Sequence, residues 1–176
     1  AEEKSYAAWQ FDALSGLAES SAREDSPFRK ELEKAGGAVR EMVRSAAALI
    51  SDPGADKALR NAAVRLVGRG PALGSAPAGA LETLAGLLNI RNGLALQELA
   101  VDSLARIQSP EVPTLLLRGW KGQAPSIRSR ILTLILRREE WLPTLLDAME
   151  SGLVATGELD ALERAGLTSH PNAALR

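Results

Sequence analysis

Three segments of the chain read as copies of one helix, and they decide the fold. They are LRNAAVRLVGR at residues 59–69, LQELAVDSLAR at residues 96–106 and IRSRILTLILR at residues 127–137. Successive copies begin 37 and 31 residues apart, and Leu175-Arg176 begins a fourth copy 48 residues after the third. A unit of this length, irregular in spacing, is typical of a helix pair in an α-solenoid.

The aligned copies share columns of small and aliphatic residues. Ala63 and Ala100 occupy one column, and Val67, Leu104 and Ile135 occupy another. The spacing within each copy places these residues on one face of a helix. A single pair cannot bury such a face alone, so we expect neighbouring pairs to stack on one another.

Gly, Pro and Ser breaks divide the rest of the chain into further helices. A short charged segment is expected to open at Ser26-Pro27 and to end at Gly36-Gly37. Apart from this segment, eight or nine helices joined by short connections are predicted. They span about residues 5–19, 38–51, 56–69, 77–89, 94–108, 109–120, 125–138, 139–151 and 158–167.

The composition agrees with an all-helical protein and excludes several kinds of chemistry. Of 176 residues, 30 are Ala and 29 are Leu, both strong helix formers, whereas aromatic residues make up only 3%. This balance favours helices whose backbones approach closely. The absence of cysteine excludes disulfides, thiolate metal sites and covalent haem attachment. A net charge of −1 provides no basic field for nucleic acid, and no apolar run is long enough to span a bilayer.

The repeated segments resemble HEAT-type repeats, whose second helix typically begins with an aliphatic residue and Arg and often follows an Asp-Pro or Ser-Pro turn. Asp52-Pro53, Ser109-Pro110 and His170-Pro171 are similar to such turns. The resemblance covers about residues 37–176 and implies an all-α, right-handed superhelix. We expect one HEAT-like domain over the whole chain, with capping helices in residues 1–36. It implies no particular activity, because solenoids serve unrelated functions.

The C-terminal part carries a narrower resemblance. It is similar to the helical-repeat segment of multidomain membrane-bound dehydrogenases of planctomycete bacteria. The residues that carry this resemblance are 145–152 (LLDAMESG), Glu158-Leu159, Arg164, Leu167, His170-Pro171 and Leu175-Arg176. In that family this segment lies between a propeller-like dehydrogenase domain and a haem-binding domain. The resemblance implies an excerpt of a longer, extracytoplasmic protein. This chain has no Cys-x-x-Cys-His motif, so neither catalysis nor haem is implied for it.

Charge segregation marks the candidate functional region. Ionisable residues from Arg118 to Arg138 are all basic, whereas those from Glu139 to Glu163 are all acidic. Two such neighbours are expected to pair across a shared groove, each exposed pair contributing about 0–1 kcal/mol. The alternative is a basic strip that binds an acidic or phosphorylated partner. Its candidate residues are Arg118, Trp120, Lys121, Arg128, Arg130, Arg137, Arg138 and Trp141.

The sequence suggests roles for the tryptophan side chains and for the arginines that recur in the repeat. Trp120 and Trp141 either fill space between small-residue helices, which we favour, or act as exposed anchors for a partner. Trp9 is expected in the core or as a cap. Arg60 and Arg128 are expected to belong to the repeat, linking units through hydrogen bonds to loop carbonyls or carboxylates.

Other reactive groups have ordinary structural interpretations. His170, the single histidine, is expected in a turn, and one histidine without cysteine cannot form a usual zinc site. The carboxylate pairs Asp147/Glu150 and Glu158/Glu163 are expected at a solvated surface, and Glu139 and Glu140 favour a helix N-terminus. The glycine-rich residues 68–74 lack the Lys-Ser/Thr of a phosphate-binding loop and predict a helix stop.

Together these observations predict a non-catalytic surface that binds another protein or another domain of the same polypeptide. No cofactor, metal ion, nucleic acid or direct membrane insertion is expected. The main alternative is a nucleic-acid-binding or DNA-repair protein, because HEAT-like folds include DNA glycosylases. That alternative requires a continuous basic surface, which the balanced charge opposes. An enzyme that uses a carboxylate pair is the third possibility.

Overall fold

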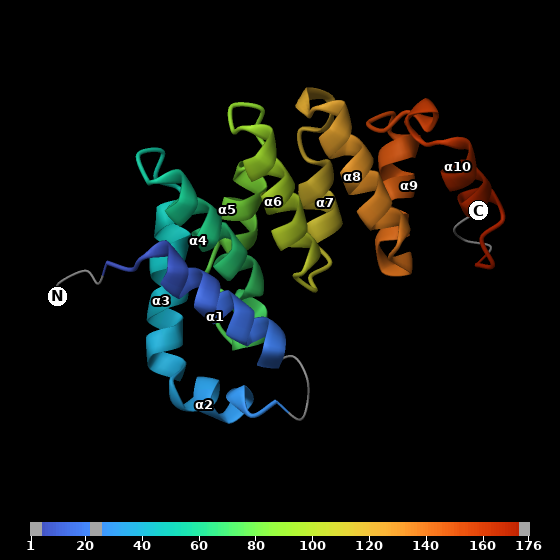
Figure 1. Cartoon of the computed structure of the whole chain (residues 1–176). Coiled ribbons are helices and arrows are strands. Elements are labelled where there is room, and N and C mark those ends of the chain that lie inside the picture. Colours follow the sequence, from blue (N-terminus) through green and yellow to red (C-terminus); the bar gives the residue numbers. More distant parts are fainter. Residues whose placement is uncertain (1–4, 22–25, 173–176) are drawn as a thin grey trace.

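The chain is all-α, as predicted. The computed structural model describes residues 5–21 and 26–172, and within these ranges it contains ten α-helices, four short 3₁₀ helices and no strand (Figure 1). The helix beyond the expected nine is the charged segment after Pro27. The expected fourth copy at Leu175-Arg176 lies outside the described residues. In the described ranges, no helix is both long and apolar enough to cross a bilayer.

The helices follow the predicted segments closely. The α-helices are α1 (Ala8–Ser21), α2 (Phe28–Lys34), α3 (Gly36–Ile50), α4 (Lys57–Arg69), α5 (Ala80–Gly86), α6 (Leu94–Ala105), α7 (Val112–Leu117), α8 (Pro125–Leu136), α9 (Leu142–Glu150) and α10 (Ala161–Thr168). The 3₁₀ helices are η1 (Gly70–Leu73), η2 (Trp120–Gly122), η3 (Glu139–Trp141) and η4 (Thr156–Glu158).

Local sequence signals explain where several helices begin. The Asp56 carboxylate accepts hydrogen bonds from the backbone N–H groups of Ala58 and Leu59 and caps α4. Asp160 and Glu163 form a reciprocal capping box at the start of α10. One boundary was predicted wrongly: Gly36 does not end the preceding helix but begins α3, because the chain turns at Ala35 instead.

Eight of the α-helices, all except α2 and α10, form two rows (Figure 1). In one row, α5 packs against α3, α7 against α5, and α9 against α7. In the other row, α1 packs against α4, α6 against α4, and α8 against α6. The helices of each pair, α3/α4, α5/α6 and α7/α8, contact one another across the rows. Segments distant in sequence are therefore brought side by side within each row.

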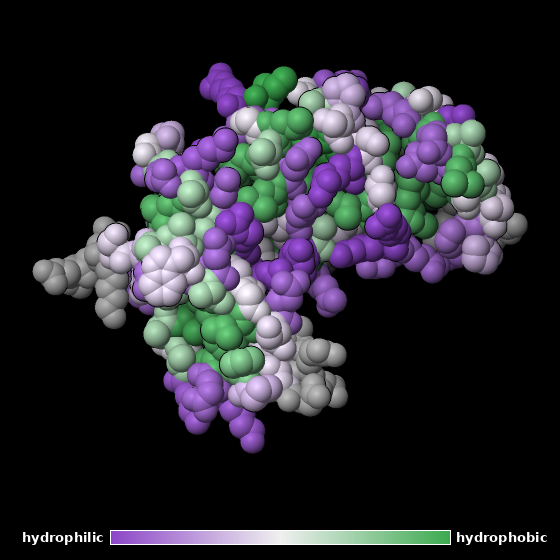
Figure 2. Space-filling view, in the orientation of Figure 1, coloured by the Kyte–Doolittle hydropathy of each residue, from purple (hydrophilic) through white to green (hydrophobic). Residues whose placement is uncertain are grey.

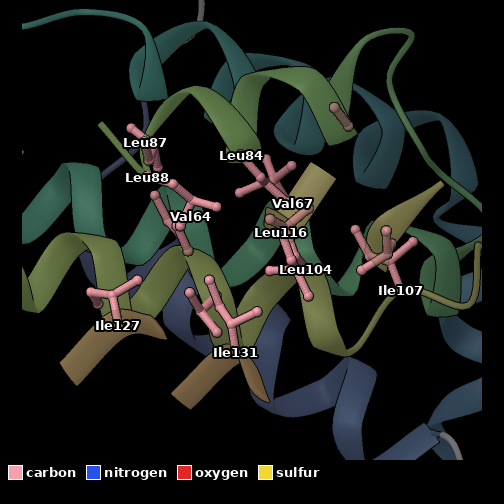
Figure 3. Packing of buried hydrophobic residues seen from close by; sticks show 14 of the residues in the cluster. Val64, Val67, Leu84, Leu87, Leu88, Leu104, Ile107, Leu116, Ile127 and Ile131 are labelled. Carbon is pink, nitrogen blue, oxygen red and sulfur yellow. The ribbon is translucent and has the colours of Figure 1, made fainter. Parts of the chain in front are cut away.

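The repeat columns form the core between the rows. Ala63 and Ala100 are fully buried, and so are Val67, Leu104 and Ile135, as the alignment predicts. Figure 3 shows residues of α4, α5, α6, α7 and α8 meeting in one continuous cluster. The prediction for the first helix was wrong at one position. Trp9 is 69% exposed, because Phe11, Leu14 and Ala18 provide the buried face of α1.

The predicted close approach of backbones occurs between α4 and α6. A Cβ atom placed on Gly68 would lie 2.6 Å from the Cβ and 2.9 Å from the Cα of Ser103. The Ser103 hydroxyl donates a hydrogen bond to the carbonyl of Val64 at 3.3 Å. Only glycine therefore fits at position 68 while the two helices keep this separation.

Candidate functional site

Trp120 is a core residue rather than an exposed anchor. Its ring is fully buried beneath the turn between α7 and α8, and its Nε1–H donates a hydrogen bond to Glu158 Oε1 at 2.9 Å. Arg128 lies over the ring, 5.8 Å from its centroid, and its Nη1 is 2.7 Å from Glu158 Oε2. These three residues connect α8 to the segment between α9 and α10.

Trp141 is also buried, with 3% of its surface exposed, so the packing interpretation is confirmed for both tryptophans. The guanidinium of Arg138 lies 4.1 Å from the Trp141 ring centroid. Its Nη2 donates to the carbonyl of Ala105, the last residue of α6. Positive charge at a helix C-terminus is favourable, so Arg138 joins α6 to the start of the α9 segment.

In the three repeat copies that the structure describes, the second residue makes a polar contact, which is a hydrogen bond for Arg60 and Gln97 and an ion pair for Arg128. Arg60 Nε donates to the carbonyl of Ile50, the last residue of α3, at 2.9 Å. In the same column, Gln97 Nε2 donates to the carbonyl of Asn92 in the turn before α6, and Arg128 pairs with Glu158. The predicted link between successive units is therefore present at Arg128, but it was wrong for Arg60, which bonds within its own pair, α3/α4.

Two further arginines pair with acids that precede them in the sequence. Arg118 Nη1 and Nη2 lie 2.5 and 3.1 Å from the two carboxylate oxygens of Glu82 on α5. Arg130 contacts both carboxylate oxygens of Asp102 on α6 at 2.7 Å. The hydrogen bond from Arg118 lowers the pKa of Glu82, and the same bond raises the pKa of Arg118. Each pair joins consecutive helices of one row.

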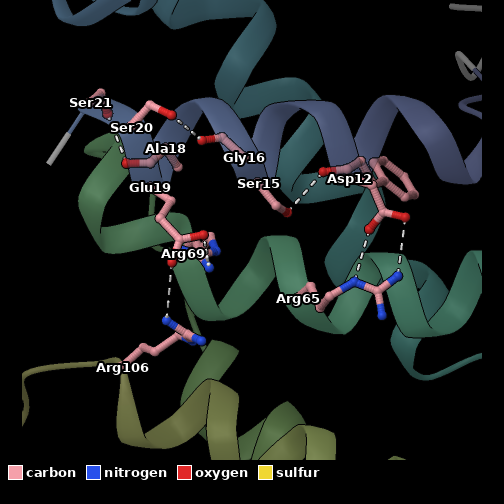
Figure 4. A network of polar contacts seen from close by, with 11 residues as sticks. Asp12, Ser15, Gly16, Ala18, Glu19, Ser20, Ser21, Arg65, Arg69 and Arg106 are labelled. Atoms are coloured by element: carbon pink, nitrogen blue, oxygen red, sulfur yellow. Dashed lines mark hydrogen bonds and ion pairs between the residues drawn. The ribbon is translucent and has the colours of Figure 1, made fainter. Parts of the chain in front are cut away.

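Similar ion pairs continue along the row of α1, α4 and α6 (Figure 4). Asp12 on α1 accepts two hydrogen bonds from Arg65 on α4, at 2.9 and 3.1 Å. Glu19 accepts a hydrogen bond from Arg69 at 2.8 Å and lies 3.9 Å from Arg106. Figure 2 shows hydrophilic residues gathered on this face, over α4, α6 and α8. The face is charged, yet many of its cations already have anionic partners.

Six of the eight residues predicted to bind a partner make contacts within the fold, as described above; they are Arg118, Trp120, Arg128, Arg130, Arg138 and Trp141. Lys121 and Arg137 are exposed, with no ion-pair partner among the described residues, but they lie at opposite ends of α8. The expected pairing with the acidic segment 139–163 occurs once, between Arg128 and Glu158. Arg118, Arg130 and Arg138 instead contact Glu82, Asp102 and the Ala105 carbonyl, which all precede them in the sequence.

The remaining sequence candidates have structural roles. Nδ1 of His170 accepts a hydrogen bond from the Asn172 N–H at 3.2 Å, which fits the predicted turn. Glu163 belongs to the capping box of α10, and Glu158 to the Trp120 contact. The glycine-rich residues 68–74 end α4 and form η1, with Gly74 at a φ of 63°, so the predicted helix stop is confirmed.

A groove of about 710 Å³ on α9 was not predicted from the sequence. Four acidic side chains line it together with Pro143, Leu146 and Asn172; they are Glu139, Glu140, Asp147 and Glu150. Asp147 and Glu150 share this face, as their spacing predicts. In residues 5–21 and 26–172, no group of three His, Cys, Asp or Glu side chains is arranged to hold a metal ion. The spacing of Glu140, Asp147 and Glu150, seven and then three residues apart, was the signal for a common acidic face.

A second groove, of about 400 Å³, lies between the α8–α9 junction and α10. Its apolar lining consists of Leu136, Leu142, Leu162 and Leu167, and Arg137 and His170 are among its polar residues.

Comparison with known proteins finds no matching family model, no matching curated protein and no matching solved structure.

Proposed function

We propose that the chain is a HEAT-like, right-handed α-solenoid that acts as a non-catalytic scaffold, binding another protein or another domain of the same polypeptide. The observation that carries this proposal is the pair of helix rows, in which each pair buries its apolar face against its neighbours. Such stacking leaves a long exterior available for a partner. The repeat is further supported by Arg60, Gln97 and Arg128, which occupy the same position in the three copies and each make a polar contact with another segment. The similarity of residues 145–176 to a dehydrogenase-associated repeat segment supports the interdomain form of this role.

The pattern of ion pairs favours a protein partner over nucleic acid. Binding to a phosphate backbone requires several free cations along one surface. Arg118, Arg130 and Arg65 each lie within hydrogen-bond distance of a carboxylate. Their partners are Glu82, Asp102 and Asp12. A nucleic acid would have to displace these carboxylates, which lowers the gain from each phosphate contact.

The experiment that tests the proposal is capture followed by reconstitution. Because the chain contains no cysteine, a single introduced cysteine allows immobilisation at one defined position. Captured proteins are identified, produced separately and titrated against the purified chain by calorimetry. The proposal predicts a saturable complex with one partner molecule per chain. It is contradicted if no captured protein binds after purification, or if a DNA duplex binds tightly with a steep loss of affinity as salt rises.

A further inference from the structure

Within residues 5–21 and 26–172, no other helix of its row packs against the outer side of α9. Within the described residues, α3 is followed in this row by α5, α5 by α7, and α7 by α9. In α9, Leu142, Leu145 and Ala148 point into the core. Pro143, Leu146, Asp147 and Glu150 line the groove on the side away from it. The groove therefore lies on the face of α9 that is turned away from the core.

The charge of this face specifies what kind of helix fits. Five acidic side chains of the described residues form ion pairs with arginines of other elements; they are Asp12, Glu19, Glu82, Asp102 and Glu158. The acids of the α9 groove have no ion-pair partner in the described part of the chain. Four like charges along one groove repel one another, and cations placed between them would relieve that repulsion.

We propose that this groove, which we call the α9 groove, binds a basic amphipathic helix of another polypeptide. The inference deepens the proposed scaffold function and rests on it. The helix lies along α9, with its apolar stripe on Pro143 and Leu146 and its Lys or Arg side chains facing the four carboxylates. The nine residues of α9 give a contact about 13 Å long, which two to three turns of a partner helix match.

A synthetic peptide provides the direct test. The probe is a fluorescein-labelled peptide of about 14 residues built from Leu, Ala and Lys, with leucines spaced three and four apart. We expect saturable binding by fluorescence anisotropy that weakens as salt rises. A peptide with Glu in place of every Lys should not bind. The helical content of the bound peptide, measured by circular dichroism, should exceed that of the free peptide.

Charge-neutral variants locate the binding site. The double variant Asp147→Asn/Glu150→Gln should weaken binding about fivefold to tenfold, because two exposed ionic contacts are lost. The double variant Glu33→Gln/Glu111→Gln removes the same charge from exposed positions outside the α9 groove, on α2 and before α7. It should leave the affinity unchanged. Both variants should retain the melting temperature of the parent, since none of these side chains is buried.

Three results would overturn the proposal. They are an absence of saturable binding by the folded protein, equal binding by the lysine and glutamate peptides, and equal loss in both double variants. Self-association that Asp147→Asn/Glu150→Gln abolishes, measured by light scattering over a range of concentrations, would assign the α9 groove to a second copy instead. Failure of the peptide together with a reconstituted partner complex would refute the α9 groove and leave the scaffold function supported.

Discussion

Replacement of Gly68 by alanine tests the contact between α4 and α6. In most helix positions this change stabilises a protein, because alanine is favoured over glycine by about 1 kcal/mol. Here the new Cβ would lie 2.6 Å from the Cβ of Ser103, whereas carbon atoms pack at about 3.5–4.0 Å. The helices would have to separate by about 1 Å and loosen the buried contacts around Ala63 and Ala100. Overpacking of this kind costs more than the propensity gain, so we expect a net loss of about 1–3 kcal/mol.

Gly16 provides the matched control. It lies inside α1, and a Cβ placed on it would meet nothing within 4 Å. Gly16→Ala should therefore raise the free energy of unfolding by about 0.5–1 kcal/mol. Both variants are measured by urea denaturation followed by circular dichroism, with unchanged slopes as the condition for comparison. A Gly68→Ala variant as stable as the parent protein would refute the close contact between α4 and α6.

Three further predictions concern the core, the buried indole and the exposed pair at α5. Leu116→Ala should lower the free energy of unfolding by about 2–5 kcal/mol in urea denaturation, because the side chain is fully buried. Glu158→Ala leaves the Trp120 N–H without its acceptor and should cost about 1–3 kcal/mol, with altered tryptophan fluorescence. Carbon-detected NMR titration should find the pKa of Glu82 below its ordinary value, and Arg118→Ala should restore it. Because that pKa is lowered on folding, the small stabilisation is present above the ordinary pKa and is lost as the pH falls through the lowered one.

The sequence predicted the helices and the buried columns because both are encoded locally. Helix starts follow from Asp56 and the prolines, and the columns of Ala63 and Val67 follow from the 3.6-residue period. Leu99 and Leu134 are instructive exceptions, because both belong to aligned copies yet are only partly buried. Leu66 and Ser103 share the aligned column of Leu134 and are buried. Burial along a column therefore depends on which helices surround each copy, which no single helix encodes.

The candidate site was harder to predict because its partners are distant in sequence. The sequence favoured packing for Trp120, but it gave no indication that Glu158, 38 residues later, accepts the indole N–H. It also paired the basic segment with the acids that follow it, whereas Arg118 and Arg130 pair with acids that precede them. The acids of the groove on α9 were assigned in pairs, Asp147 and Glu150 to a solvated surface and Glu139 and Glu140 to a helix N-terminus. The sequence does not show that these acids line one groove, because the groove depends on how α9 packs against the rest of the fold.

The two-row arrangement is tested most directly by cross-linking pairs of introduced cysteines, since the chain has none of its own. Glu82 and Arg118 join α5 to α7 in one row, and Asp102 and Arg130 join α6 to α8 in the other. With a short bis-maleimide, cysteines at 82 and 118 should cross-link within a chain, and so should cysteines at 102 and 130. The crossed pairs, 82 with 130 and 102 with 118, should not. Efficient linkage of a crossed pair, or none in either matched pair, would contradict the stacking on which the proposed scaffold depends.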